Sequence, residues 1–142
     1  MNEAKFQVFN LKKWKSNKQI LESTKEEIID DRRSIVFSPE LPGHGHADVI
    51  KRYNNILHNV DVYNDHIHAY EVVIKRLELC INKLLNIEQK EVIEIYIDNP
   101  DKGDSLKREH IALEKGYSRT KFYDLANQSF KILNEALKEN NY

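Results

Sequence analysis

The strongest pattern of apolar and polar positions lies between residues 49 and 84, where apolar side chains recur in alternating steps of four and three. The series is Val49, Tyr53, Ile56, Val60, Tyr63, Ile67, Tyr70, Ile74, Leu77, Ile81 and Leu84. These steps keep the side chains on one face of a helix, and neither proline nor glycine interrupts residues 47–85. The pattern predicts one helix roughly 54 Å long, at about 1.5 Å per residue.

The sequence leaves open what covers this apolar seam. One set of seam positions is mostly β-branched and the other ends in leucine, which favours a two-stranded homodimer through the Val49–Leu84 seam. The tyrosines of the seam are bulky for such a dimer, so the chain's own first helix is the alternative cover. Both arrangements remain open at this point.

That first helix is predicted to begin at Ser16. The run Ser16-Asn17-Lys18-Gln19 matches a capping box, in which serine and glutamine each bond an amide of the first turn. The apolar positions Trp14, Leu21, Ile28 and Ile35 then recur seven apart. The connection FSPELPGHG at 37–45 contains two prolines and two glycines and cannot be helical.

A second capping box, at Asn86 and Gln89, predicts a helix that runs through Ile97. Its inward positions are Val92, Ile93 and Tyr96. Residues 98–104 form a turn-rich loop, after which Asp104 or Ser105 caps a helix that ends near Lys115. Ser118 caps a last helix that runs to about Lys138.

The two last helices have the layout of a helix-turn-helix. The first helix needs a small residue at its middle, which Ala112 supplies, and the turn needs a residue that tolerates positive φ, which Gly116 supplies. The back of the second helix is Phe122, Ala126, Phe130 and Leu133. Two ordinary packed helices would use the same glycine as a stop and the same apolar residues as core.

The polar face of the last helix supplies the candidate DNA-binding residues. They are Ser118, Arg119, Thr120, Lys121, Tyr123, Asn127, Gln128 and Lys131. We expect Lys121 and Lys131 to meet phosphate, and Arg119, Tyr123 and Asn127 to face bases. The helix N-terminus at Ser118 itself favours a phosphate.

The stretches LLNIEQKEVIEIYIDNP and HIALEKGYSRTKFYDLANQSFKILNEAL resemble region 4 of sigma-70-type factors. More narrowly, they resemble ArpU/RinA-type regulators of phages and prophages of Gram-positive bacteria. The matching residues are Val92, Ile93, Tyr96, Ile111, Ala112, Ser118, Phe122 and Tyr123. The resemblance covers residues 85–137 and departs at Lys115, where the pattern has a large apolar residue. It implies an activator of phage late genes, such as packaging and structural genes, that acts with bacterial RNA polymerase.

The charge distribution changes this picture only a little. The net charge is −1, yet residues 105–142 hold seven Lys/Arg and five Asp/Glu, whereas residues 36–104 hold seven and twelve. The last third is therefore the surface that suits DNA better. The acidic middle, which includes Glu88, Glu91 and Glu94, reads as a solvated helix face or as a contact for a basic polymerase surface.

Other chemistry finds little support in the sequence. His44, His46 and Asp48 spell the opening of a metallo-β-lactamase-type motif, but Val49 stands where the next histidine belongs. No nucleophile elbow, glycine-rich phosphate loop or zinc quartet occurs, so we expect no enzyme, cofactor or metal. No apolar run reaches the length of a membrane span, and the single Cys80 suits a reducing cytoplasm.

Together these patterns predict an all-α protein with a helical hairpin or coiled coil over residues 1–85 and a helix-turn-helix domain over residues 86–142. The expected function is a sequence-specific transcription regulator that binds double-stranded DNA in the bacterial cytoplasm. The alternative is a non-enzymatic helical interaction protein, such as a small phage packaging subunit or an adaptor, in which the long helix carries the function.

Overall fold

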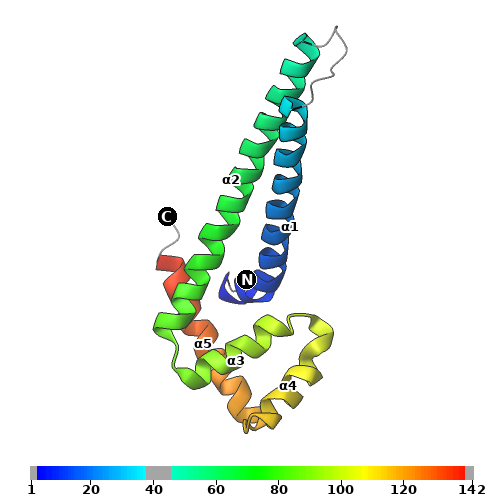
Figure 1. Ribbon diagram of the computed structural model, residues 1–142. Coiled ribbons are helices and arrows are strands. Elements are labelled where there is room, and N and C mark those ends of the chain that lie inside the picture. The colour runs from blue at the N-terminus through cyan, green and yellow to red at the C-terminus, as the bar shows by residue number, and fades with distance from the viewer. Residues whose placement is uncertain (1–2, 38–45, 140–142) are drawn as a thin grey trace. The chain divides into compact units, whose positions relative to one another are not determined.

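The computed structural model describes the backbone of residues 3–37 and 46–139 and most side chains of these ranges, and within them it is all-α, as predicted. The long helices are α1 (Glu3–Phe37) and α2 (His46–Leu84). They are followed by α3 (Ile87–Asp98), a 3-10 turn η1 (Lys102–Asp104), α4 (Ser105–Glu114) and α5 (Arg119–Glu139), as Figure 1 shows. Phe37, the first residue of the predicted non-helical connection, is the last residue of α1, and the rest of that connection, 38–45, lies outside the described residues.

The chain divides into two compact units. The helix-pair unit is Lys15–Val72, and the terminal unit combines Met1–Trp14 with Val73–Tyr142. This division differs from the predicted boundary after residue 85, because both the start of α1 and the end of α2 belong with the C-terminal helices. At the start of α1, Phe9 contacts the aromatic core of the terminal unit, and at the end of α2, Leu77 and Ile81 are buried.

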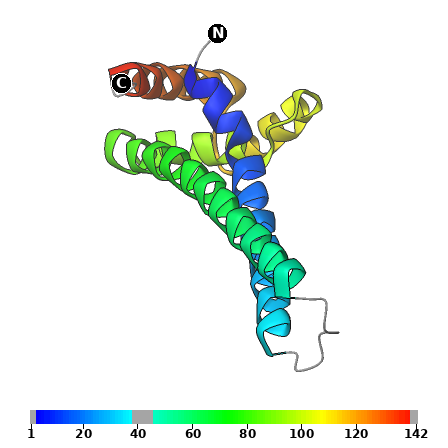
Figure 2. The ribbon, with the colours of Figure 1, turned by 90° about the horizontal axis from the view of Figure 1, so that it is seen from above.

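In the helix-pair unit, α1 from Lys15 and α2 up to Val72 run side by side (Figures 1 and 2). The Nδ2 of Asn17 donates a hydrogen bond of 3.3 Å to the hydroxyl of Tyr70, and Lys18 Nζ lies 3.6 Å from Glu71 Oε1. Ile67 is the single buried hydrophobic residue among the described side chains of this unit. Among the side chains described there, the helix pair therefore buries little apolar surface.

The predicted α2 helix is confirmed as one element of 39 residues. Of its seam, Ile67, Ile74, Leu77 and Ile81 are buried within a single chain, whereas Leu84 is 47% exposed. The side chains of Val49, Tyr53 and Ile56 lie outside the described residues. Within a single chain, four of the eight described seam residues are buried, and Val60, Tyr63 and Tyr70 are half-buried, so both possible covers of the seam remain open.

The predicted start of the first helix at Ser16 is wrong, because α1 begins at Glu3 and Ser16 lies exposed inside it. Ala4, Val8 and Leu11 repeat at helical spacing and are at most 1% exposed. The ring of Phe9, on the same segment, lies 5.9 Å from that of Tyr96 and 6.4 Å from that of Phe130, centroid to centroid. Burial of this stripe extends the helix through the local capping signal.

The capping box of α3 is confirmed. Gln89 N donates to Asn86 Oδ1 at 2.8 Å, and Asn86 N donates to Gln89 Oε1 at 3.1 Å. The inward residues of α3 are Val92, Ile93 and Tyr96, with exposed fractions of 0, 0 and 7%. The helix ends at Asp98, one residue beyond the predicted Ile97. A fixed start orients α3 so that its inward face meets α5.

Candidate nucleic-acid interface

The turn between α4 and α5 is closed by a double hydrogen bond. Tyr117 N donates to Ala112 O at 2.9 Å and Gly116 N donates to Leu113 O at 3.0 Å, which is the pattern of a Schellman motif. Gly116 has φ of +92°, a conformation that L side chains rarely adopt. The glycine predicted from the sequence to make this turn therefore does so, and the geometry depends on it.

The start of α5 is capped as predicted. Lys121 N donates to Ser118 Oγ at 3.2 Å, and Phe122 N donates to Ser118 O at 2.8 Å. Because of this cap, α5 begins at Arg119, and Arg119, Thr120 and Lys121 lie in its first turn.

The predicted back of the second helix is confirmed. Ala112, Phe122, Ala126, Phe130 and Leu133 are at most 2% exposed. The rings of Tyr96 and Phe122 stack at 5.5 Å with an angle of 7° between their planes, and Tyr96 meets Phe130 edge-on at 5.2 Å. This aromatic core fixes α5 against α3 and leaves its other face outward.

Most predicted DNA-binding residues lie on that outward face. The exposed ones are Ser118, Arg119, Thr120, Lys121, Asn127, Gln128 and Lys131. The 21 residues of α5 present them over about three helical turns, close enough for one surface. Asp124, which the sequence interpretation passed over, is exposed on the same face and adds a carboxylate among these groups.

The expectation that Tyr123 faces outward needs a correction. Its side chain is half-buried rather than exposed, and its hydroxyl is already hydrogen-bonded within the protein. The hydroxyl donates to Glu109 Oε1, and the ring lies 5.2 Å from that of Phe122. The same Glu109 oxygen lies 3.4 Å from Arg119 Nε. Tyr123 follows the buried Phe122, and its contact with α4 partly buries it. The sequence pattern does not reveal this contact.

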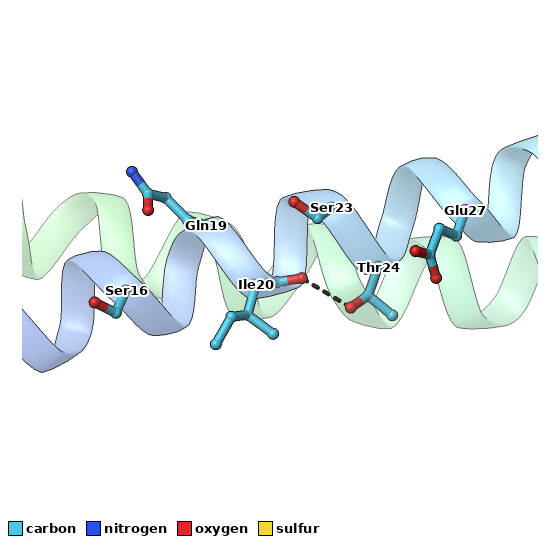
Figure 3. Close-up of a pocket in the computed structure, with 6 residues that line it drawn as sticks. All are labelled: Ser16, Gln19, Ile20, Ser23, Thr24 and Glu27. Atoms are coloured by element: carbon cyan, nitrogen blue, oxygen red, sulfur yellow. Dashed lines mark hydrogen bonds between the residues drawn. The ribbon is translucent and has the colours of Figure 1, made fainter.

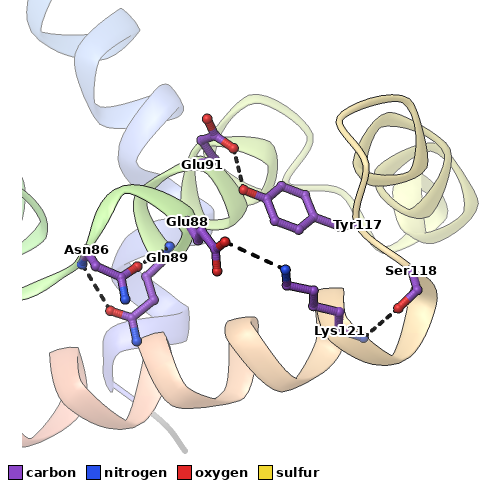
Figure 4. Close-up of polar contacts among 7 residues, drawn as sticks. All are labelled: Asn86, Glu88, Gln89, Glu91, Tyr117, Ser118 and Lys121. Atoms are coloured by element: carbon purple, nitrogen blue, oxygen red, sulfur yellow. Dashed lines mark hydrogen bonds and ion pairs between the residues drawn. The ribbon is translucent and has the colours of Figure 1, made fainter.

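Carboxylates of α3 hold two further residues near the turn (Figure 4). Lys121 Nζ lies 3.6 Å from Glu88 Oε1 and 5.5 Å from the centre of the Tyr117 ring. Tyr117, 7% exposed, donates from its hydroxyl to Glu91 Oε2 at 2.5 Å. This hydrogen bond, followed by burial and the charges of Glu91 and Glu88, raises the pKa of Tyr117 to about 12.

The resemblance to the sigma-type pattern is looser at Lys115, which is exposed. Tyr117, two residues later, is buried instead. Its ring lies at the position after the glycine, where a Schellman motif often makes its apolar contact.

Arg108 of α4 has a structural role that the sequence did not indicate. Its Nη1 donates to Asn99 O at 2.7 Å and to Asp101 O at 2.9 Å. Its guanidinium carbon lies 4.9 Å from the centre of the Tyr96 ring. These contacts tie α4 to the loop after α3 and take this arginine out of the set available to a ligand.

A shallow depression lies on α1 in the helix-pair unit, lined by Ser16, Gln19, Ile20, Ser23, Thr24 and Glu27 (Figure 3). Thr24 Oγ1 donates to the backbone oxygen of Ile20 at 2.8 Å, while the Ile20 side chain is 63% exposed. The lining comes from a single helix face, so this depression offers few converging groups to a small ligand.

No cluster of three or more metal-ligating side chains occurs among the described residues. Of the histidine motif, His44 and the side chains of His46 and Asp48 lie outside them. None of the helices in the described ranges combines the length and apolarity that a membrane crossing requires.

Comparison with protein-family models, curated proteins and solved structures yields no match to this chain. The interpretation of α4 and α5 as a nucleic-acid interface therefore depends on their geometry and sequence alone.

Proposed function

We propose that this chain is a sequence-specific regulator of transcription that binds double-stranded DNA through α4 and α5. The observation that carries the proposal is the turn at Gly116, closed by two hydrogen bonds and followed by the Ser118 cap. Such a turn holds two helices rigidly while the second one presents polar side chains. A helix presented in this way can enter a major groove, where side chains reach base edges.

The charges of the outward face of α5 favour a nucleic-acid partner moderately. Arg119, Lys121 and Lys131 are balanced in part by Asp124. A face with a small positive excess releases few counterions, so binding to random DNA should be weak and most of the affinity should come from base contacts.

The resemblance to ArpU/RinA-type regulators extends the proposal to activation of phage late genes together with bacterial RNA polymerase. The exposed Glu88 and Glu94 and the half-buried Glu91 of α3 offer an acidic surface for a basic polymerase. In this arrangement α5 selects the promoter and α3 contacts the enzyme. A homodimer through α2 would place two such modules on one operator.

Footprinting on the DNA that flanks the protein's own gene tests the proposal. A protected segment is expected, and Asn127→Ala should weaken binding to it by roughly 1–3 kcal/mol while changing binding to random DNA much less. Lys131→Ala should weaken binding to every DNA and lower the salt slope by about one unit.

Lys138→Ala is the matched control for Lys131→Ala, because it removes the same charge from the last turn of α5. Its salt slope should equal that of the wild type. A folded wild type that protects no DNA at low salt contradicts the proposal.

A second candidate, a helical interaction protein such as a packaging subunit or adaptor, is favoured by the exposed leucines of α4. Leu106 and Leu113 are seven residues apart and are 79% and 66% exposed. Exposed apolar residues on one helix face suit a protein partner. Under this alternative, footprinting shows no protection.

A further inference from the structure

Glu109 stands apart from the other acidic residues near the turn, because it belongs to α4 and contacts α5. One of its oxygens, Oε1, accepts the hydrogen bond of the Tyr123 hydroxyl and lies 3.4 Å from Arg119 Nε. The Glu109 side chain is 19% exposed, whereas that of Arg119 is 78% exposed. A largely covered carboxylate thus contacts the exposed Arg119 and the half-buried Tyr123 at once.

The contact with Arg119 joins Nε of the guanidinium to Glu109 Oε1. The two terminal nitrogens remain as a planar fork, which is the geometry that binds O6 and N7 of a guanine. Because Nε is held, the fork loses part of the rotational freedom of a long exposed side chain. Less entropy is then lost when it binds a base.

The contact with Tyr123 fixes the direction of its hydroxyl hydrogen. A phenol that donates to a carboxylate can only accept from a further partner. Among base edges in the major groove, the amino groups of cytosine and adenine donate. With its hydrogen directed at Glu109, the Tyr123 hydroxyl can form a hydrogen bond with the amino group of cytosine or adenine, but not with a base acceptor.

The same carboxylate also acts against binding. It places a negative charge beside the surface that would approach phosphates, and it competes with DNA for Arg119. Its effect on affinity and its effect on discrimination thus have opposite signs, which makes them separable in one experiment.

We propose that Glu109 is a positioning residue that determines specificity: it lowers affinity for all DNA and raises the preference for the cognate site, by orienting Arg119 and Tyr123. The inference rests on the proposed DNA-binding function.

The experiment compares dissociation constants for the footprinted duplex and for a random duplex of equal length at one salt concentration. Glu109→Gln removes the charge with little change in shape. It should tighten binding to random DNA several-fold and lower the ratio of specific to random affinity about tenfold, within the range that one bidentate base contact supplies. Glu109→Asp keeps the charge and shortens the reach. It should lower the ratio similarly while leaving affinity for random DNA unchanged.

Glu114→Gln is the matched control. Glu114 lies on the same helix, is 66% exposed, and pairs with His110 at 3.0 Å. Its neutralisation removes an equal charge without touching Arg119 or Tyr123, so the ratio should stay at the wild-type value.

A double-mutant cycle separates positioning from a general structural effect. In an Arg119→Ala background, Glu109→Gln should lower the ratio much less than in the wild type, because the group it orients is gone. Circular dichroism on each variant establishes that it is folded.

The outcomes are distinct. If Glu109→Gln and Glu109→Asp both keep the wild-type ratio, or if the loss is equally large without Arg119, the positioning role is overturned and DNA binding stands. If the wild type binds both duplexes equally or not at all, the proposed function fails and this inference fails with it.

Discussion

The helix-pair unit and the terminal unit use the same kind of helix in different ways. In the helix-pair unit two helices face only each other, and Ile67 is the single buried hydrophobic residue among the side chains described there. In the terminal unit, aromatic rings of α1, α3 and α5 meet in one core, and α5 buries residues along most of its length. A helix buries more when it has neighbours on two sides, and that burial is what holds a binding surface in place.

The difference predicts unequal local stability. Regions with few buried apolar contacts open at lower cost than cores do. We expect amide hydrogens of α1 after Lys15 and of α2 before Val72 to exchange faster than those of α3 and α5.

Phe122→Ala should have the largest effect and should unfold the terminal unit. Phe122 is fully buried and stacks on Tyr96, so its loss leaves a cavity that costs about 3–5 kcal/mol. Chemical denaturation followed by the fluorescence of the single Trp14 measures the change. Phe6→Ala is the control, because that ring is 45% exposed and its removal should cost far less.

Ile67→Asp should open the helix-pair unit and leave the terminal unit folded. A buried unpaired carboxylate costs several kcal/mol, but the opening of this unit relieves it, so the net loss stays below that of Phe122→Ala. Circular dichroism should show lost helix while the terminal unit keeps its protected amides. Ala69→Asp, at an exposed position of the same helix, should do neither.

Sedimentation of the same variants tests the homodimer predicted from the seam. If the wild type is a dimer and Ile67→Asp is a folded monomer, the seam joins two chains. The packing of Ile67 within one chain is then not what stabilises the seam.

Gly116→Ala should cost about 1–2 kcal/mol, because alanine must adopt the positive φ of the turn. A Cβ at this position would meet no atom within 4 Å, so the loss comes from the backbone alone. Gly103→Ala, where a Cβ is also unobstructed, should be neutral or slightly stabilising. Equal thermal stability of the two variants would contradict this account of the turn.

The smallest expected effect concerns Tyr117 at high pH. Its pKa in the folded chain is raised to about 12, against about 10 in an unfolded chain. The neutral phenol therefore stabilises the fold fully below about pH 10, and this contribution is lost as the pH rises toward 12. Tyr117→Phe lacks this titration, so the stability gap between wild type and variant should narrow from about pH 9 to about pH 12 in urea denaturation.

The sequence predicted best what short segments decide. The caps at Asn86 and Ser118 and the turn at Gly116 each depend on residues at most six apart, so their signals can be read without knowledge of the fold. The helical seam of α2 is equally local, since it repeats along one element.

The sequence failed where distant segments compete with local signals. Ser16 carries a capping pattern, yet the helix runs through it because Val8 and Leu11 are buried in the terminal unit. The partners of Tyr123 and Lys121 come from α4 and α3, and no pattern within α5 reveals them. Contacts of this kind depend on tertiary geometry, which a single sequence does not specify residue by residue.

The contact of Phe9 with the rings of Tyr96 and Phe130 has a consequence for synthesis on the ribosome. The first apolar stripe leaves the exit tunnel on the order of ten seconds before its partners on α5 are made. During that time Val8 and Leu11 have no aromatic core to cover. These exposed apolar side chains of the nascent chain are then available for chaperones to bind. The contacts of Phe9 with α5 can therefore form only after α5 has been synthesised.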